Sequence, residues 1–287
     1  MGAAIEVVNL VKKYGNHTVI HGLSFTAMQG EIFALLGANG AGKTTTLECI
    51  EGIRRYHEGT IRVHGRIGVQ LQSSSLMENI TALEAYKLFS KWNNAKTDQT
   101  VLQNFGIMEF RNKQYGTLST GQKRKLHLVI ALINDPDIII LDEPTAGLDV
   151  EGRVSLHQEI RKLKEAGKTI LMASHDMAEV ESLCDRIAIL REGELAFLGT
   201  ADELSGSGFG ERMISLHTRN PFPQVKLRYS KAGSLEKNYF TVTTSEISDA
   251  LLELLTMLKE MDNEVIDIKI ERASMEERFI EIAKEGK

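Results

Sequence analysis

Short apolar stretches alternate with helical patterns along most of this chain. Strand-like runs at 5–14 and 18–28 precede a turn and a continuous apolar run at 31–37. Further on, the apolar run 138–141 and the strand-like run 169–175 are each followed by a segment with helical periodicity. Strands that alternate with helices predict βαβ units, and therefore a parallel sheet flanked by helices.

Two regions interrupt this alternation. Residues from about 73 to 135 have mainly helical character and are expected to form an insert between two halves of the core. The sequence SGSGFG at 205–210 is a candidate domain boundary, because glycine and serine favour loops. We therefore expect one domain over 1–205 and a small α/β domain over 211–287.

The C-terminal region carries its own pattern of strands and helices. Strand character occurs at 213–219, 225–230, 238–244 and 264–270. A helix is predicted from apolar residues on one face, namely Ile247, Leu251, Leu254, Leu255 and Leu258. Ser274 and Glu277 fit a capping box that begins a last helix. The sequence of this region contains no motif whose chemistry we can identify.

The composition is typical of a folded, water-soluble protein. Hydrophobic residues make up 42% and charged residues 25% of 287 positions, a length that suits about two domains. A net charge of −5 disfavours nucleic acid as the main partner. Because no run of about 18 apolar residues and no signal-peptide pattern occur, any membrane-spanning part is expected in another chain. Cys49 and Cys184 are expected to be reduced, buried thiols.

The first chemical motif is a glycine-rich loop between a strand and a helix. Residues 37–44, GANGAGKT, match G-x-x-x-x-G-K-[ST] and follow the apolar run. Backbone N–H groups of such a loop surround phosphate oxygens, while Lys43 reaches the β and γ phosphates and Thr44 places its hydroxyl on Mg²⁺. The loop predicts a nucleoside triphosphate, but it suits a kinase, a GTPase, a motor or a transporter equally. The predicted contacts are Gly37, Ala38, Asn39, Gly40, Ala41, Gly42, Lys43, Thr44 and Thr45.

Two carboxylates follow the apolar run 138–141. Asp142 and Glu143 lie at the carboxyl end of an expected parallel strand, which is where ligands bind in such sheets. Asp142 is expected to hold Mg²⁺ through its water shell, and Glu143 to polarise the attacking water. Loss of Glu143 should then stop turnover without abolishing nucleotide binding.

A second polar, glycine-containing helix start occurs further along the chain. The sequence LSTGQ, at 118–122, places a serine at a helix start with free N–H groups, which is typical of an anion site. Together with the loop at 37–44 and Asp142-Glu143, this motif makes residues 1–205 resemble the ATP-binding subunits of ABC transporters. That family's signature, usually LSGGQ, serves the γ-phosphate of a nucleotide held by a partner subunit. Thr120 departs from the family's glycine, a change that could weaken the approach of the backbone to phosphate or slow closure.

The resemblance also assigns roles to single residues. It implies that Tyr14 stacks on adenine, that Gln72 reaches Mg²⁺ and the attacking water, and that His175 contacts the γ-phosphate. Gln70 is the alternative for this role. Gln72 is preferred because its distance from the end of the strand matches that of the family's glutamine. The loop that ends at Asp149 matches the segment that crosses the dimer interface. The signature residues offered to the partner's nucleotide are Ser119, Thr120, Gly121 and Gln122. The following run KRK, at 123–125, is interpreted as a solvated helix face.

The resemblance implies an α/β P-loop core of ABC type with an antiparallel β subdomain and a helical subdomain. Two copies would bind two ATP and Mg²⁺ between them and drive a separate polytopic permease from the cytoplasmic face of the cell membrane. The C-terminal domain resembles that of ATPases paired with ABC-2-type exporters, which favours export. Two alternatives remain: a soluble ABC-type ATPase that acts on nucleic acid or ribosomes, and a docking module that binds ATP without hydrolysing it.

Overall fold

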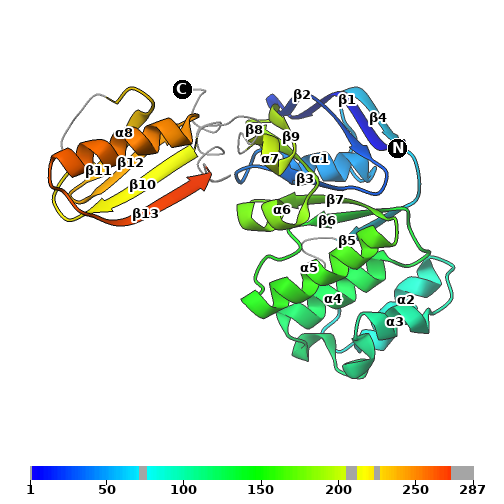
Figure 1. Cartoon of the computed structure of the whole chain (residues 1–287). Coiled ribbons are helices and arrows are strands. Elements are labelled where there is room, and N and C mark those ends of the chain that lie inside the picture. The colour runs from blue at the N-terminus through cyan, green and yellow to red at the C-terminus, as the bar shows by residue number, and fades with distance from the viewer. Residues whose placement is uncertain (1, 71–75, 205–211, 223–226, 273–287) are drawn as a thin grey trace. The chain divides into compact units, whose positions relative to one another are not determined.

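A computed structural model describes residues 2–70, 76–204, 212–222 and 227–272, without the side chains of 232–236 and 271–272. The chain forms two compact units, Met1–Gly199 and Thr200–Lys287, whose elements are labelled in Figure 1. The expected boundary at 205–210 and the capping box at Ser274 and Glu277 lie outside the described residues, as does Gln72.

A six-stranded sheet forms the centre of the first unit. Its strand order is β5-β6-β7-β3-β8-β9, and all neighbours are parallel except β8 and β9. The strands are β3 (Ile32–Leu36), β5 (Ile67–Gln70), β6 (Ile138–Asp142), β7 (Thr169–Ser174), β8 (Arg186–Arg191) and β9 (Glu194–Gly199). Every residue of β3, β6 and β7 is buried, as expected for continuous apolar strands of a parallel sheet covered on both faces. The predicted parallel sheet is confirmed.

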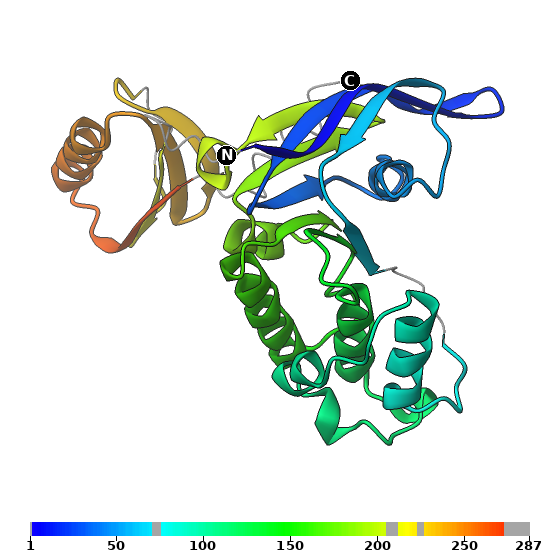
Figure 2. The ribbon, with the colours of Figure 1, turned by 90° about the vertical axis from the view of Figure 1, so that its right-hand side faces the viewer.

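A second, antiparallel sheet has the order β2-β1-β4. Its strands are β1 (Ala3–Tyr14), β2 (His17–Met28) and β4 (Glu58–Val63). Helix α1 (Lys43–Ile50) lies between the two sheets (Figure 2), and its Leu47 and Ile50 share one apolar cluster with residues of both, such as Ile5 and Ile140. This packing fixes the start of α1 near the carboxyl end of β3, an inner strand of the central sheet. The remaining helices of the core are α5 (Val150–Glu165) and α6 (Met177–Leu183).

A helical region connects β5 to β6, as the sequence predicts. It contains α2 (Ala82–Trp92), α3 (Gln99–Asn104), the 3₁₀ turns η1 (Ile107–Glu109) and η2 (Tyr115–Thr117), and α4 (Thr120–Ala131). Helix α2 begins with a complete capping box between Thr81 and Glu84. Leu126 and Val129 of α4 are fully buried, so that the apolar side of α4 packs inward while its first residues stay exposed.

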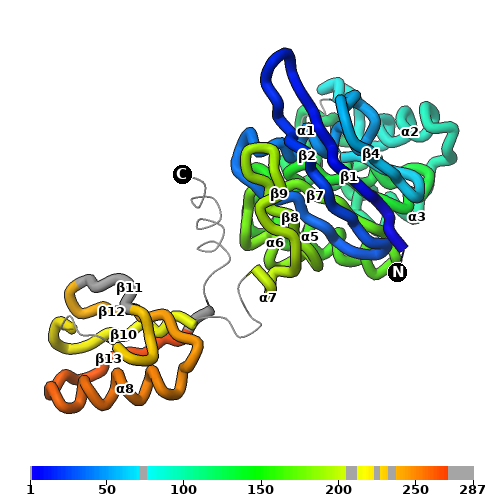
Figure 3. The backbone as a smooth tube through the Cα atoms, turned by 90° about the horizontal axis from the view of Figure 1, so that it is seen from above, coloured from blue at the N-terminus to red at the C-terminus, as the bar shows by residue number. Residues whose placement is uncertain are grey.

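The second unit contains a four-stranded antiparallel sheet of order β11-β12-β10-β13 and helix α8 (Figure 3). The elements are α7 (Ala201–Leu204), β10 (Arg212–Thr218), β11 (Lys231–Glu236), β12 (Tyr239–Thr244), α8 (Ile247–Glu260) and β13 (Val265–Arg272). Its apolar core joins Leu216 and Phe240 of the sheet to Leu254 and Leu258 of α8. The small α/β fold that we expected is present.

Two details of this unit were predicted wrongly. Residues 227–230 form no strand, because the backbone N–H groups of Arg228 and Tyr229 donate to the carboxylate of Glu253 on α8 instead of to a neighbouring strand. Leu255 is 39% exposed, since the buried stripe of α8 runs through Ala250, Leu254 and Leu258. Within the described residues, no helix combines the length and the apolar character needed to cross a membrane.

Candidate functional site

The glycine-rich loop joins the end of β3 to the start of α1. Gly40 and Gly42 have φ values of 84° and 100°, which glycine adopts without strain. At Gly37 an added Cβ would lie 2.6 Å from the carbonyl oxygen of Leu190, so the loop runs against β8 too closely for a side chain. A cavity of about 220 Å³ is lined by Val19, Ala38, Asn39, Gly40, Gly42, Lys43, Thr44, Thr45 and Glu143. Seven of the nine predicted phosphate contacts therefore face one cavity, whereas Ala41 is buried.

Lys43 places its amino group inside the loop. Its Nζ donates to the carbonyl oxygens of Gly37 at 2.6 Å and Ala38 at 3.3 Å, and it lies 3.8 Å from Oε1 of Glu143. The residue is 6% exposed. Burial lowers the pKa of Lys43, while the negative charges of Glu143 and Asp142 oppose that shift. A buried cation held this way favours an anionic ligand such as phosphate.

Asp142 and Thr44 form the second part of the site. The Thr44 hydroxyl donates to Oδ2 of Asp142 at 2.9 Å. The other oxygen, Oδ1, is buried and has no hydrogen-bond partner among the described residues. Burial raises the pKa of Asp142, which shows the cost of an ionised carboxylate there. A hydroxyl and an unpaired carboxylate oxygen suit Mg²⁺, which prefers oxygen ligands and would offset this cost.

Glu143 and His175 meet at the ends of neighbouring strands. Glu143 follows β6 and His175 follows β7, and because Asp142 pairs with Ala173 the two side chains emerge together. Nδ1 of His175 lies 2.7 Å from Oε2 of Glu143, whose side chain is 10% exposed. Glu143 has a φ of 49°. That left-handed conformation is uncommon for a non-glycine residue and tends to occur at functional sites.

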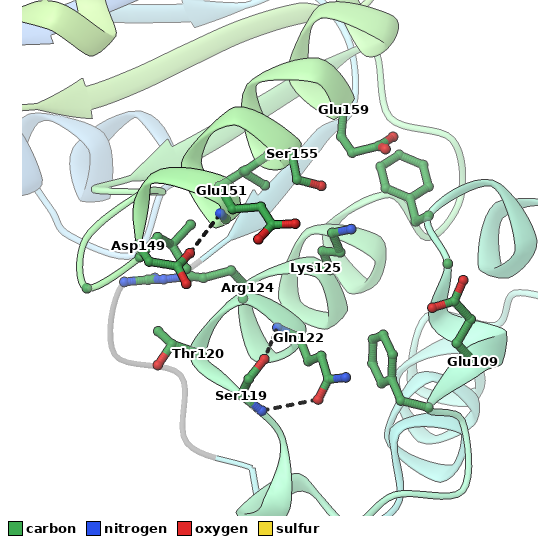
Figure 4. A pocket seen from close by; sticks show the side chains of 18 of the residues that line it. Glu109, Ser119, Thr120, Gln122, Arg124, Lys125, Asp149, Glu151, Ser155 and Glu159 are labelled. Carbon is green, nitrogen blue, oxygen red and sulfur yellow. Dashed lines mark hydrogen bonds between the residues drawn. The ribbon is translucent and has the colours of Figure 1, made fainter.

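The signature turn begins α4 and faces a second cavity, shown in Figure 4. Ser119 is the N-cap: its hydroxyl accepts from the backbone N–H of Gln122 at 3.2 Å, and Oε1 of Gln122 accepts from the N–H of Ser119 at 3.1 Å. The cavity has a volume of about 740 Å³ and also borders Gly147, Leu148 and Asp149. Signature and phosphate loop therefore line different cavities of one chain.

Five of the predicted site residues are described by the structure and line neither cavity, namely Gly37, Ala41, Asp142, Tyr14 and His175. Tyr14 is 41% exposed at the end of β1, with Lys12 Nζ 4.7 Å and Arg54 Cζ 5.6 Å from its ring centre. Gln72 falls outside the described residues. Gln70, the alternative, is 2% exposed and donates to the carbonyl oxygen of Arg124 at 3.4 Å, so its side chain faces α4. His175 touches the first site through Glu143.

Sequence reasoning missed two residues that belong to this region. Val19 lines the phosphate cavity, yet an apolar residue of a strand gives no signal for that. Arg124 is partly buried, and its guanidinium donates to the carbonyl oxygen of Ala146 at 3.2 Å. The interpretation of 123–125 as a solvated helix face is therefore wrong at Arg124, which ties α4 to the loop after Glu143.

The fold and the phosphate loop together define an ATP-binding cassette. The family model described as ABC transporter matches residues 20–146, and the chain belongs to the ATP-binding proteins of ABC transporters, ATPases that power transport. It is 38% identical over 237 residues to a Nod factor export ATP-binding protein I of Burkholderia orbicola (strain AU 1054). The alignment covers 76% of this chain and 78% of that protein.

Two further relatives agree with this assignment. The linearmycin resistance ATP-binding protein LnrL of Bacillus subtilis (strain 168) is 35% identical over 230 residues, or 74% of each chain. A solved structure of an ATP binding subunit of an ABC transporter superposes with a TM-score of 0.64 at 27% identity, covering 71% of this chain and 92% of that one.

Proposed function

We propose that two copies of this chain bind two ATP and Mg²⁺ between them, hydrolyse the ATP, and thereby drive a separate membrane permease that exports its substrate. One observation carries the proposal: Lys43, Glu143 and His175 form a chain of contacts, at 3.8 and 2.7 Å, at the phosphate loop. A cation for phosphate thus lies beside a carboxylate that is suited to act on water.

The catalytic side of the site would use residues of one chain. Thr44 and Asp142 would hold Mg²⁺, which when bound neutralises charge on the phosphates. Lys43 would bind the β and γ phosphates through its buried ammonium group. Glu143 would accept a proton from the attacking water, and His175 would orient that carboxylate through the contact at Nδ1. Gln72 and Tyr14 are assigned to the attacking water and the adenine ring by resemblance alone.

The second copy would complete the site. Ser119, Thr120 and Gly121 are solvent-accessible at the start of a helix, where N–H groups and the helix dipole favour a phosphate. Because these residues and the phosphate loop line different cavities of one chain, sharing between two chains in head-to-tail orientation accounts for both. Asp149, which borders the signature cavity, would lie at the same interface.

The permease and the direction of transport are proposed from the relatives. One of them is named for export and another for linearmycin resistance, and transport of a molecule out of the cell would account for both names. We place the chain at the cytoplasmic face of the membrane, bound to the permease, with no nucleic-acid partner. The alternative, an ATPase that acts on nucleic acid or ribosomes, predicts that these rather than a polytopic membrane protein copurify with the chain in mild detergent.

The substitution Glu143→Gln tests the catalytic assignment. The variant should bind ATP, lose turnover by roughly 10²- to 10⁴-fold, and accumulate as an ATP-bound dimer, because the site can close but not reopen. ATPase rate and sedimentation with and without ATP measure both effects. Lys43→Ala is the matched control, since it should lose nucleotide binding itself. Turnover by Glu143→Gln at the rate of the unsubstituted protein would contradict the assignment of the base.

A further inference from the structure

A buried hydrogen bond spans the signature turn. Tyr115 begins η2, just before the turn, and His127 lies within α4, just after it. The Tyr115 hydroxyl and Nε2 of His127 are 3.1 Å apart, and the two rings stack with their centroids 5.7 Å apart. Both residues are 8% exposed. The pair therefore connects the segment that enters the signature turn to the helix that leaves it.

The backbone around Tyr115 is fixed to another part of the helical region. The N–H of Tyr115 donates to the carbonyl oxygen of Ile80 at 2.8 Å, and the N–H of Gly116 donates to that of Glu78 at 2.9 Å. An added Cβ at Gly116 would lie 3.2 Å from Cβ of Glu78, so the two segments pack closely. Through Tyr115, the segment that enters α2 is joined to α4.

The surroundings of His127 keep its imidazole neutral at neutral pH. Burial lowers the pKa of His127 to about 4, and the positive charges of Arg124 and Lys123 act in the same direction. A neutral imidazole can accept the hydroxyl hydrogen at Nε2, whereas a protonated one has no acceptor. Nζ of Lys123 also lies 4.8 Å from the centre of the Tyr115 ring, which adds a cation–π contact on the same aromatic group.

We propose that Tyr115 and His127 are positioning residues that hold the signature turn, Leu118–Gln122, in the orientation that meets the ATP of a second copy. The capping box of Ser119 and Gln122 fixes the shape of the turn, whereas the direction of the turn depends on the two segments it joins. The inference rests on the proposed function, because the turn acts only where two copies share ATP. The pair acts through Ser119 and Gly121 and not by touching the nucleotide.

The test compares two affinities in full-length protein that carries Glu143→Gln. The first is the affinity of the monomer for ATP, measured below the concentration at which it dimerises. The second is the dissociation constant of the ATP-bound dimer, measured by sedimentation. Tyr115→Phe and His127→Leu should each raise the dimer constant by about two- to tenfold, as expected for one hydrogen bond, and leave the affinity of the monomer unchanged. A loss of folding would instead weaken both the binding of ATP by the monomer and the formation of the dimer.

Three further variants separate positioning from general packing. Tyr86→Phe removes the hydroxyl of another buried tyrosine, on α2 at 2% exposure, and should leave the dimer constant unchanged. His127→Gln places an amide at about the position of Nε2 and should restore most of the affinity. The double variant Tyr115→Phe/His127→Leu should be no weaker than either single one, because partners in one bond are not additive.

Two results would overturn the inference. One is a Tyr115→Phe protein that dimerises as well as the Tyr86→Phe protein, and the other is an additive loss in the double variant. Both leave the proposed function intact, since the Glu143→Gln parent would still form its ATP-bound dimer. If that parent forms no such dimer, the proposed function fails and the positioning role fails with it.

Discussion

Single residues decide the chemistry of the phosphate cavity, and most of them act through burial. Lys43, Asp142 and Glu143 are each less than 10% exposed, so each charge depends on its neighbours. Thr44 bonds one oxygen of Asp142 and leaves the other unpaired among the described residues. A cation at this carboxylate and an anion at Lys43 would satisfy both groups. The nucleotide and Mg²⁺ thus suit the burial that the fold imposes.

Glu51 offers a test of these buried charges. It follows α1, its Oε2 is buried without a partner among the described residues, and burial raises its pKa to about 7, with further contributions from Asp142 and Glu48. The folded protein keeps this proton up to about pH 7, whereas the unfolded chain loses it near 4.5. Stability should therefore fall as the pH rises between these values and stay reduced above them.

Glu51→Gln should remove that loss. In buffer without nucleotide or Mg²⁺, the variant should gain roughly 1 to 3 kcal/mol in free energy of unfolding over the unsubstituted protein at about pH 8, and much less at about pH 5. Urea unfolding at the two pH values measures the difference. An equal effect of the substitution at both values would show that Glu51 is not protonated in the folded state.

At the scale of elements, close packing between β5 and α4 joins the core to the helical region. Gly68 of β5 has no room for a side chain, since an added Cβ would lie 2.0 Å from the carbonyl oxygen of Ala131 and 2.7 Å from Cγ of Pro136. Gln70 on the same strand bonds the backbone of Arg124, whose side chain reaches Ala146. The signature helix is therefore tied to both β5 and the loop after Glu143.

Gly68→Ala should disturb this joint. The methyl group would force β5 away from the end of α4, and overpacking of this kind costs about 1–3 kcal/mol. Gly121→Ala is a matched control for stability, because the nearest atom to its added Cβ is 3.9 Å away and its φ is ordinary. Calorimetric unfolding of both variants measures the effect. A Gly68→Ala protein that unfolds at the temperature of the Gly121→Ala protein would contradict the role given to this contact.

Elements were predictable where one strong local pattern decides them. The buried runs of β3 and β6, the phosphate loop and the start of α4 all follow from sequence. Contacts between distant segments were not, because no local pattern encodes them. The cation–π contacts of Lys12 and Arg54 with Tyr14, and the hydrogen bond of Gln70 to α4, depend on the tertiary packing of strands and helices. Residues 227–230 look like a strand, but the N–H groups of Arg228 and Tyr229 donate to the carboxylate of Glu253.

For the whole molecule, the central claim is that each ATP is shared between two copies. The phosphate loop and the signature turn line separate cavities of one chain, and a two-fold pair would bring the loop of each copy to the turn of the other. Residues 1–205 and 211–287 are proposed as separate domains, with the second unit built on its own apolar core. Every described residue that lines these two cavities belongs to the first unit.

One mixing experiment tests this claim most directly. Lys43→Ala disables the phosphate loop, and Gly121→Glu places a negative charge in the signature turn, so each variant alone should lack ATPase activity. A mixed pair would combine the intact loop of one copy with the intact turn of the other. The mixture should regain up to about a quarter of normal turnover, because half of random pairs are mixed and each holds one intact site of two. A mixture as inactive as its components would contradict sharing of ATP between copies.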